Sequence, residues 1–432
     1  MVELKRIVVV GAGPAGMMAA IRAAQLHQDA ILIEKNPYPG RKLLLSGKGR
    51  CNLTNACDLE SFIKRFSRNG QFLRDAFKIF FNQDLMRFFQ ERGLKLKIER
   101  QLRVFPVSDK SNSIVDVLKK ELHKNRVKII YKSTMKDIFI QNNKIKGLLL
   151  SDRRFIPADK IILATGGVSY SFTGSNAEGL TIAQRLGHRI VSPKPGLVPL
   201  ETRQTYPRLL EGLTLKNIRL KFCDGKKEII SEIGELLFTH FGISGPLVLS
   251  LSGQIVDWLK ENKPRPSLEC NTVLKEERGK HVYVEIDLKP ALSKEQLNAR
   301  LLREFELNPK KSIKNVLPSL LPRRLADVFI GMVKIAPDKK VSQIIQAERE
   351  SLVSLLKGLR LDITQSRPIE EAMITRGGIS LKDINPRTME SRLVKGLYFA
   401  GEMIDVDADT GGFNLQAAFS TGYLAGGSAA LN

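Results

Sequence analysis

A glycine turn near the beginning of the chain is the first feature whose residue types and spacing could do chemistry. Residues 11–16 read Gly-Ala-Gly-Pro-Ala-Gly and fit the pattern G-x-G-x-x-G. In this pattern the first glycine permits a tight turn, the second lets the backbone approach a diphosphate, and the third lets a helix pack closely on a strand. Glu34 follows 23 residues after Gly11, where a carboxylate can bind both hydroxyls of an adenosine ribose. The sequence therefore predicts a dinucleotide site formed by Gly11, Gly13, Pro14, Ala15, Gly16, Glu34 and Lys35.

A second segment, residues 40–55, combines basic side chains with glycines and small hydrogen-bonding groups. We interpret it as a loop that follows the diphosphate and the ribityl chain toward a flavin ring, the alternative being a solvated basic loop. Cys51 could be redox-active beside a flavin, although a lone cysteine without a resolving partner is more often a packing residue. The predicted cofactor contacts here are Arg41, Lys42, Ser46, Gly47, Gly49, Arg50, Cys51, Asn52, Thr54 and Asn55.

Two further glycine-rich segments follow predicted strands, at the sheet edge where α/β proteins bind ligands. The first is Ala164-Thr165-Gly166-Gly167. The second begins at Gly401 and opens the last helix, whose N-terminus can stabilise negative charge on the N1/O2 side of a reduced flavin. We expect its cofactor contacts to be Gly401, Glu402, Asp405, Gly411, Gly412, Phe413, Asn414 and Leu415.

These motifs need a parallel sheet to position them. A β-branched strand at residues 6–10, a helix at 14–27 and a second strand at 30–34 predict a βαβ unit. Buried strands are predicted at 127–131 and 160–164, with a hairpin at 135–151 that forms a small β-meander. Helical patterns cover residues 61–92 and 111–125, and a small-residue helix covers 415–431.

The character of the chain changes near Pro193-Lys194-Pro195, and this change predicts an insert. We expect an N-terminal part of the first domain at 1–192, an insert at 193–373, and a return to the first domain at 374–432. Within the insert, residues 193–290 are rich in strand patterns and 291–360 in helical patterns.

Composition excludes several classes of function. The four cysteines have no CxxC spacing, and no His/Cys cluster has the spacing of a zinc site, so no metal centre is expected. The sequence shows no signal-peptide pattern and no apolar run long enough for a membrane span, so we expect a cytoplasmic protein with reduced thiols. The net charge of +24 is dispersed in short patches such as Lys119-Lys120 and Pro309-Lys310-Lys311, which does not favour a nucleic-acid partner.

Four segments together resemble the YhiN/BaiN flavoprotein family: GAGPAG, GRKLLLSGKGRCNLTN, GELLFTHFGISGP and YFAGEMIDVDADTGGFNLQAA. The resemblance spans nearly the whole chain. It implies an α/β fold in which a glutathione-reductase-like Rossmann domain for non-covalent FAD is interrupted by an insert with a β-barrel-like part and a helical part. Lys48, where a glycine is common in the family, and Ser175–Gly179 depart mildly from its pattern. Members resemble either bile-acid-type enone reductases or amine oxidases acting on aminoacetone, so the substrate stays open.

The leading hypothesis is an FAD-dependent oxidoreductase that transfers a hydride between flavin N5 and a small organic substrate. NAD(P)H could be a transient donor, although no second G-x-G-x-x-G is present to bind it. His240 and Tyr170 are the candidate catalytic proton donors or bases. The alternatives are an RNA-modifying flavoenzyme, which the positive charge suggests, and a non-enzymatic redox protein with Cys51 as its sensor.

Overall fold

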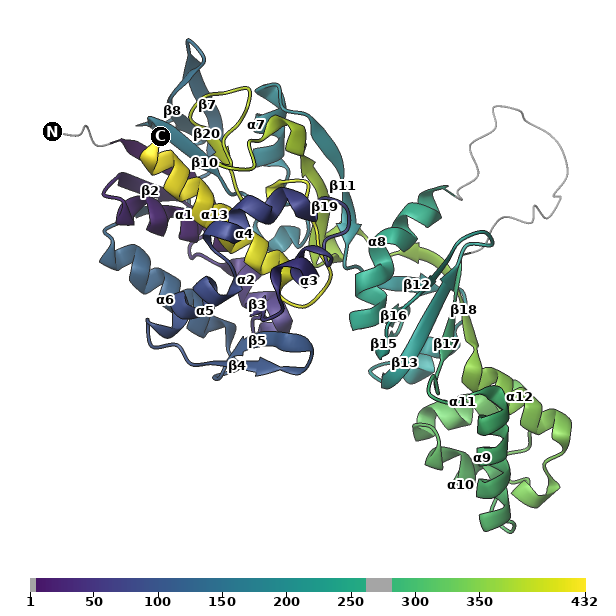
Figure 1. Cartoon of the computed structure of the whole chain (residues 1–432). Coiled ribbons are helices and arrows are strands. Elements are labelled where there is room, and N and C mark those ends of the chain that lie inside the picture. Colours follow the sequence, from purple (N-terminus) through teal and green to yellow (C-terminus); the bar gives the residue numbers. More distant parts are fainter. Residues whose placement is uncertain (1–4, 262–281) are drawn as a thin grey trace, which may run out of the picture. The chain divides into compact units, whose positions relative to one another are not determined.

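The strand that precedes the glycine turn becomes the central strand of a parallel sheet. In the computed structural model, which describes residues 5–261 and 282–432, the chain divides into two units (Figure 1). Unit 1 comprises the chain up to Gly196 together with Ile369–Asn432, and unit 2 comprises Leu197–Pro368. Each unit has its own hydrophobic core. Cys270 lies outside the described residues.

The main sheet of unit 1 has five parallel strands in the order β20-β10-β1-β2-β6. This order brings strands from both ends of the chain together, because β20 pairs with β10 and β10 pairs with β1. The strands are β1 (Arg6–Val10), β2 (Asp29–Ile33), β6 (Lys128–Ile130), β10 (Lys160–Leu163) and β20 (Leu397–Phe399).

Three small antiparallel sheets complete the strands of unit 1. The predicted meander is confirmed as β7-β8-β9, a second sheet has the order β3-β5-β4, and β11 pairs with β19. Their bounds are β3 (Thr54–Asn55), β4 (Leu96–Glu99), β5 (Arg103–Pro106), β7 (Met135–Gln141), β8 (Lys144–Leu150), β9 (Phe155–Pro157), β11 (Ile190–Gly196) and β19 (Ile374–Ile379).

The helices of unit 1 are mostly short. They are α1 (Pro14–Gln25), α2 (Arg41–Leu45), α3 (Leu59–Ile63), α4 (Arg74–Ile79), α5 (Asn82–Gln90), α6 (Ser111–Lys124), α7 (Glu178–Arg185) and α13 (Phe413–Leu431). The helical pattern at residues 61–92 thus becomes α3, α4 and α5 rather than one helix. The chain crosses close to itself at Gly70, where a Cβ would lie 2.6 Å from the carbonyl oxygen of Ile63.

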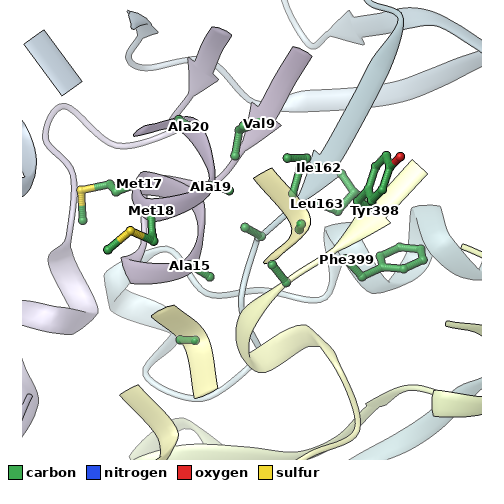
Figure 2. Close-up of a cluster of buried hydrophobic side chains, with 14 of the residues drawn as sticks. Val9, Ala15, Met17, Met18, Ala19, Ala20, Ile162, Leu163, Tyr398 and Phe399 are labelled. Atoms are coloured by element: carbon green, nitrogen blue, oxygen red, sulfur yellow. The ribbon is translucent and has the colours of Figure 1, made fainter. Parts of the chain in front are cut away.

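Glycines let α1 and α13 of unit 1 touch through their backbones. A Cβ on Gly422 of α13 would lie 2.2 Å from the carbonyl oxygen of Ala15, and one on Gly426 would lie 2.3 Å from that of Ala19. Figure 2 shows Ala15 and Ala19 of α1 in the buried cluster that also contains Ile162 of β10 and Tyr398 of β20. This packing fixes the start of α1 against the C-terminal segment of the chain.

Unit 2 contains an antiparallel barrel, as the fold prediction expected. Its strands follow the order β13-β15-β16-β12-β18-β17, and pairing of β13 with β17 closes the ring, with β14 added on β13. The strands are β12 (Leu200–Thr202), β13 (Thr214–Cys223), β14 (Glu228–Ile230), β15 (Gly234–Thr239), β16 (Gly242–Ser244), β17 (Tyr283–Asp287) and β18 (Leu359–Ser366). Strand β18 was not anticipated from the sequence, where helical patterns run up to it.

Helices make up the rest of unit 2. They are α8 (Pro246–Glu261), α9 (Lys294–Leu307), α10 (Ile313–Val316), α11 (Arg323–Val333) and α12 (Gln346–Lys357). Within the described ranges 5–261 and 282–432, no helix combines the length and the apolarity that crossing a bilayer requires.

Candidate functional site

The glycine turn is held tightly on one side and open on the other. The Gly11 N–H donates to the carbonyl of Ile33 at 2.8 Å, and a Cβ on Gly11, whose φ is +101°, would lie 2.5 Å from the carbonyl oxygen of Ala164. A Cβ on Gly16 would lie 1.8 Å from the Gly11 carbonyl oxygen. A Cβ on Gly13 would meet nothing within 4 Å. The first and third glycines are therefore required by the chain itself, while space lies over the second, at the N-terminus of α1, whose first amides have no intrahelical acceptor.

Glu34 is buried at the end of β2 and organises this turn. One carboxylate oxygen accepts the Ala12 N–H at 2.7 Å. The other accepts both the backbone N–H and the side-chain amide of Asn36, at 2.8 and 2.7 Å. Arg41 then donates to the Asn36 Oδ1 at 2.8 Å. A carboxylate oxygen has two acceptor positions, so the oxygen that faces Ala12 can still accept a ligand hydroxyl.

Lys42 joins the basic loop to the C-terminal segment. Its Nζ lies 2.8 and 2.6 Å from the two carboxylate oxygens of Glu402 and 2.7 Å from Ser169 Oγ. The Thr375 N–H donates to Glu402 at 2.7 Å, and Thr375 Oγ1 accepts the Val168 N–H at 2.8 Å. Lys42, Ser169, Thr375 and Glu402 form one polar cluster, which we call the Lys42 cluster.

The last helix begins directly on the basic loop. Gly412, with φ +96°, precedes the first residue of α13, and a Cβ there would lie 2.5 Å from both the carbonyl carbon and the oxygen of Thr54. Asn55 donates to the Gly411 carbonyl at 3.3 Å, and Thr54 donates to Gln416 at 2.7 Å. The structure thus brings two segments together that lie more than 350 positions apart in the sequence.

Other residues of the basic loop have different surroundings. Arg50 points to the carboxylates of Glu99 and Asp109 and stacks over Phe105. Cys51 is fully buried, and burial raises the pKa of its thiol to about 12, so it is not a reactive thiolate. The Oδ1 of Asn52 is buried without a hydrogen-bond partner. Since buried polar atoms in folded proteins are nearly always paired, Asn52 is an acceptor that a ligand could satisfy.

Asp405 lies beside a second acidic side chain. Burial and the nearby charge of Asp407 raise the pKa of its carboxyl. Asn69 donates to the Asp405 carbonyl at 2.9 Å and lies 3.4 Å from its carboxylate. Because of burial and the charge of Asp407, a larger fraction of Asp405 is neutral at a given pH than of an ordinary exposed aspartate.

Tyr170 stands next to the Lys42 cluster. Lys42 Nζ lies 6.0 Å from the centre of its ring, and the exposed ring of Phe172 packs edge-on against it at 5.5 Å. Burial, with a contribution from Glu371, raises the pKa of the Tyr170 hydroxyl, which therefore stays protonated at neutral pH. His240 belongs to unit 2, where its exposed ring lies 3.3 Å from Glu211.

Three further predicted residues contact other parts of the chain. Lys35 lies 3.9 Å from Glu178, Phe413 packs against Phe62, and Asn414 bonds the backbone of Ala408 through both side-chain atoms.

Sequence reasoning missed Asn36, Ser169 and Thr375. For Asn36 its position two residues after Glu34 was an available signal, whereas nothing local marks Ser169 or Thr375. Within the described residues, no group of His, Cys, Asp or Glu could hold a metal ion.

Comparison with known proteins finds a family model and several relatives that match nearly the whole chain. Residues 5–428 match the family model described as HI0933-like protein Rossmann domain. The chain is 30% identical over 431 residues to a 3-dehydro-bile acid delta(4,6)-reductase of Clostridium scindens, covering 99% of each chain. It is 31% identical over 421 residues to a ribosomal RNA dihydrouridine synthase of Haemophilus influenzae, covering 96% of each.

A solved structure shares the fold at much lower sequence identity. The 3-ketosteroid delta1-dehydrogenase of Sterolibacterium denitrificans, in complex with 1,4-androstadiene-3,17-dione, matches with a TM-score of 0.50 and 11% identity. The match covers 98% of this chain and 99% of that one. Together with the family match, this confirms the Rossmann-type α/β fold.

Proposed function

Because this chain belongs to the HI0933-like family, we propose that it is an FAD-dependent oxidoreductase that reduces a carbon–carbon double bond conjugated to a carbonyl group. The observation that carries the proposal is the free space over Gly13 at the N-terminus of α1. There the chain leaves room for a diphosphate among groups that could bind the other parts of a dinucleotide.

The residues of unit 1 fit FAD part by part. The amides at the start of α1 suit the diphosphate, and Glu34 keeps an acceptor position for an adenosine hydroxyl. The unpaired Asn52 Oδ1 and the partly exposed Lys42 cluster suit the ribityl chain and the ring. The N-terminus of α13, which begins after Gly412, favours negative charge at the pyrimidine side of the ring. When bound, FAD supplies a two-electron carrier that can take a hydride from NAD(P)H and deliver it to a substrate carbon.

The names of the two relatives support the class of substrate. A delta(4,6) reduction of a 3-dehydro bile acid and the formation of dihydrouridine from uridine both saturate a carbon–carbon bond conjugated to a carbonyl group. In such a reduction the β-carbon accepts a hydride and the α-carbon accepts a proton. The protein must therefore provide a proton donor beside the substrate.

We propose that Tyr170 is that proton donor. Its raised pKa keeps the hydroxyl protonated and so able to donate, and its ring lies beside the Lys42 cluster, with Lys42 Nζ 6.0 Å from the ring centre. Replacing Tyr170 by Phe should lower the rate of substrate reduction by about 10²- to 10⁴-fold, the usual contribution of a general acid. The rate at which NAD(P)H reduces the flavin should not change. His240→Gln is the comparison variant, since His240 was the other candidate.

A second candidate concerns the identity of the substrate rather than the chemistry. The net charge of +24 and the relative named as a ribosomal RNA dihydrouridine synthase favour an RNA uridine over a free steroid-like molecule. This reverses the expectation drawn from the sequence, where the dispersed charge did not favour a nucleic-acid partner.

Anaerobic stopped-flow spectroscopy tests the proposed function. The purified protein should show flavin absorbance and release FAD on denaturation. NADH or NADPH should bleach the flavin absorbance of the native protein. The reduced protein is then mixed with oxygen, a conjugated steroid enone or a uridine-containing RNA. Faster reoxidation by the enone or the RNA than by oxygen supports a reductase, and faster reoxidation by oxygen supports the amine-oxidase alternative. A purified protein without flavin absorbance would rule out both.

A further inference from the structure

Two lysine runs that are separate in the sequence come together in unit 2. Lys310, Lys311 and Lys314 lie around the start of α10, and Lys334, Lys339 and Lys340 follow α11. The two segments are hydrogen-bonded, with the Ile313 N–H donating to the Lys339 carbonyl at 2.9 Å and the Val341 N–H donating to the Lys311 carbonyl at 3.0 Å. An antiparallel bridge links Ser312 to Lys340 between them. We call these six lysines the lysine seam.

Acidic residues neutralise only part of the lysine seam. Lys314 pairs with Asp338 at 2.5 Å, and Lys339 pairs with Glu348 at 2.7 Å. Within the described part of the chain, no ion pair is formed by the other four, which are all exposed: Lys310, Lys311, Lys334 and Lys340. Like charges gathered on two adjacent segments repel one another. Binding of a polyanion relieves this repulsion and therefore lowers the free energy of the surface.

We propose that the lysine seam binds the phosphate backbone of an RNA substrate, an inference that rests on the proposed function and names its substrate class. Lysine ammonium groups recognise phosphates as point charges without reading bases. No aromatic residue occurs in either segment, residues 308–316 or 334–341, so base stacking contributes nothing from them. The seam therefore holds the RNA by its backbone and does not itself select a base.

The salt dependence of RNA binding tests this surface. The probe is a fluorescently labelled hairpin RNA of about 20 nucleotides with uridines in its loop, titrated with the flavin-containing protein at several KCl concentrations. The test variant neutralises three exposed residues of the seam: Lys310→Gln, Lys311→Gln and Lys340→Gln. The control variant removes the same charge from exposed lysines elsewhere in unit 2: Lys216→Gln, Lys226→Gln and Lys260→Gln.

The seam variant should bind the hairpin about tenfold more weakly or worse at 0.1 M salt. Its slope of log affinity against log salt should become shallower by about 2, since each lost phosphate contact removes about 0.7 to 0.9. The control variant should keep the wild-type slope to within about 1. Equal losses in the two variants, or no loss in the seam variant, would overturn the proposal.

Two further measurements separate the possible failures. Flavin absorbance and reduction by NADPH should be the same in the seam variant and the wild type. If the purified wild-type protein contains no flavin but still binds the hairpin, the proposed function is refuted and the proposal for the lysine seam is retained. A wild-type protein whose flavin is reduced but which does not bind the hairpin would refute the seam alone. Seam-dependent binding to phosphatidylserine vesicles, with none to the hairpin, would make the surface a membrane contact and also refute it.

Discussion

Replacing Gly13 by alanine should weaken FAD binding without harming the fold. Gly13 has φ −78° and ψ −176°, which an alanine adopts without strain. The added Cβ would meet no protein atom within 4 Å. Because neither conformation nor packing requires a glycine here, and because Gly13 stands at the N-terminus of α1 beside Glu34, we assign this space to the diphosphate of the proposed FAD.

The two effects can be estimated separately. For the protein alone, a strain-free Gly→Ala change restricts the unfolded chain and should raise the free energy of unfolding by about 0.4 to 1 kcal/mol. For the complex, one extra methyl group in a close-packed contact costs about 1 to 3 kcal/mol. Because about 1.4 kcal/mol corresponds to a factor of ten, the Kd for FAD should rise by about 5- to 150-fold.

Urea unfolding of the flavin-free protein and titration with FAD, followed by quenching of flavin fluorescence, measure the two effects. Gly331→Ala is the matched control. A Cβ on Gly331 also meets nothing within 4 Å, and the residue lies within α11 of unit 2. It should stabilise the protein by about 1 kcal/mol through helix propensity and leave the Kd for FAD unchanged.

The reasoning fails if Gly13→Ala binds FAD as tightly as the wild type, because the space over Gly13 would then not be the diphosphate site. It also fails if the variant loses stability as well as affinity, since the loss of binding would then follow from a damaged fold.

Three further predictions follow from packing and burial in unit 1. Gly422→Ala should destabilise the protein by about 1 to 3 kcal/mol or more in urea unfolding, because its Cβ would lie 2.2 Å from the Ala15 carbonyl oxygen; an unchanged midpoint would contradict this backbone contact. Iodoacetamide at pH 8 should alkylate Cys57, which is partly exposed, before Cys51, which is fully buried and whose pKa is raised to about 12, as mass spectrometry of the native protein can show; rapid labelling of Cys51 would revive the redox-sensor alternative. The raised pKa of Asp405 means that its contribution to stability is full below the unfolded-state pKa, about 3.9, and is lost as the pH rises through the folded-state pKa. Asp405→Asn should therefore stabilise the protein at pH 7 and much less at pH 4, and the same gain at both pH values would show that ionisation is not the cause.

Local patterns were sufficient to predict much of unit 1. The strand before the glycine turn was predicted at residues 6–10 and is β1, because its β-branched run is long enough and is followed by a turn that only glycines permit. The helix predicted at 111–125 is α6, at Ser111–Lys124. In both cases the signal lies within a few neighbouring residues. Strand β18 was missed although its first six residues alternate apolar and polar side chains, because this short pattern follows directly on a long helical region.

Contacts between distant segments could not be predicted in the same way. Lys42 and Glu402 were each proposed as cofactor contacts, but their ion pair joins positions 360 residues apart and depends on how α2 and the end of β20 meet. The lysine seam shows the same limit. Lys310-Lys311 was dismissed as too short, because the pairing that adds Lys339 and Lys340 is visible only in the fold. Charge counted along a sequence therefore underestimates charge gathered on a surface.

The environment of Glu34 explains why a carboxylate, and not an amide, ends β2. Three N–H donors surround it: the Ala12 N–H on one oxygen, and the backbone and side-chain N–H groups of Asn36 on the other. A glutamine in this place would set its own NH₂ group against at least one of these donors in either orientation, and a buried donor would lose its acceptor. We propose that the same carboxylate that closes the glycine turn also accepts a ribose hydroxyl. At this position the fold and the proposed ligand require the same residue, whereas at Gly13 only the proposed ligand requires a glycine.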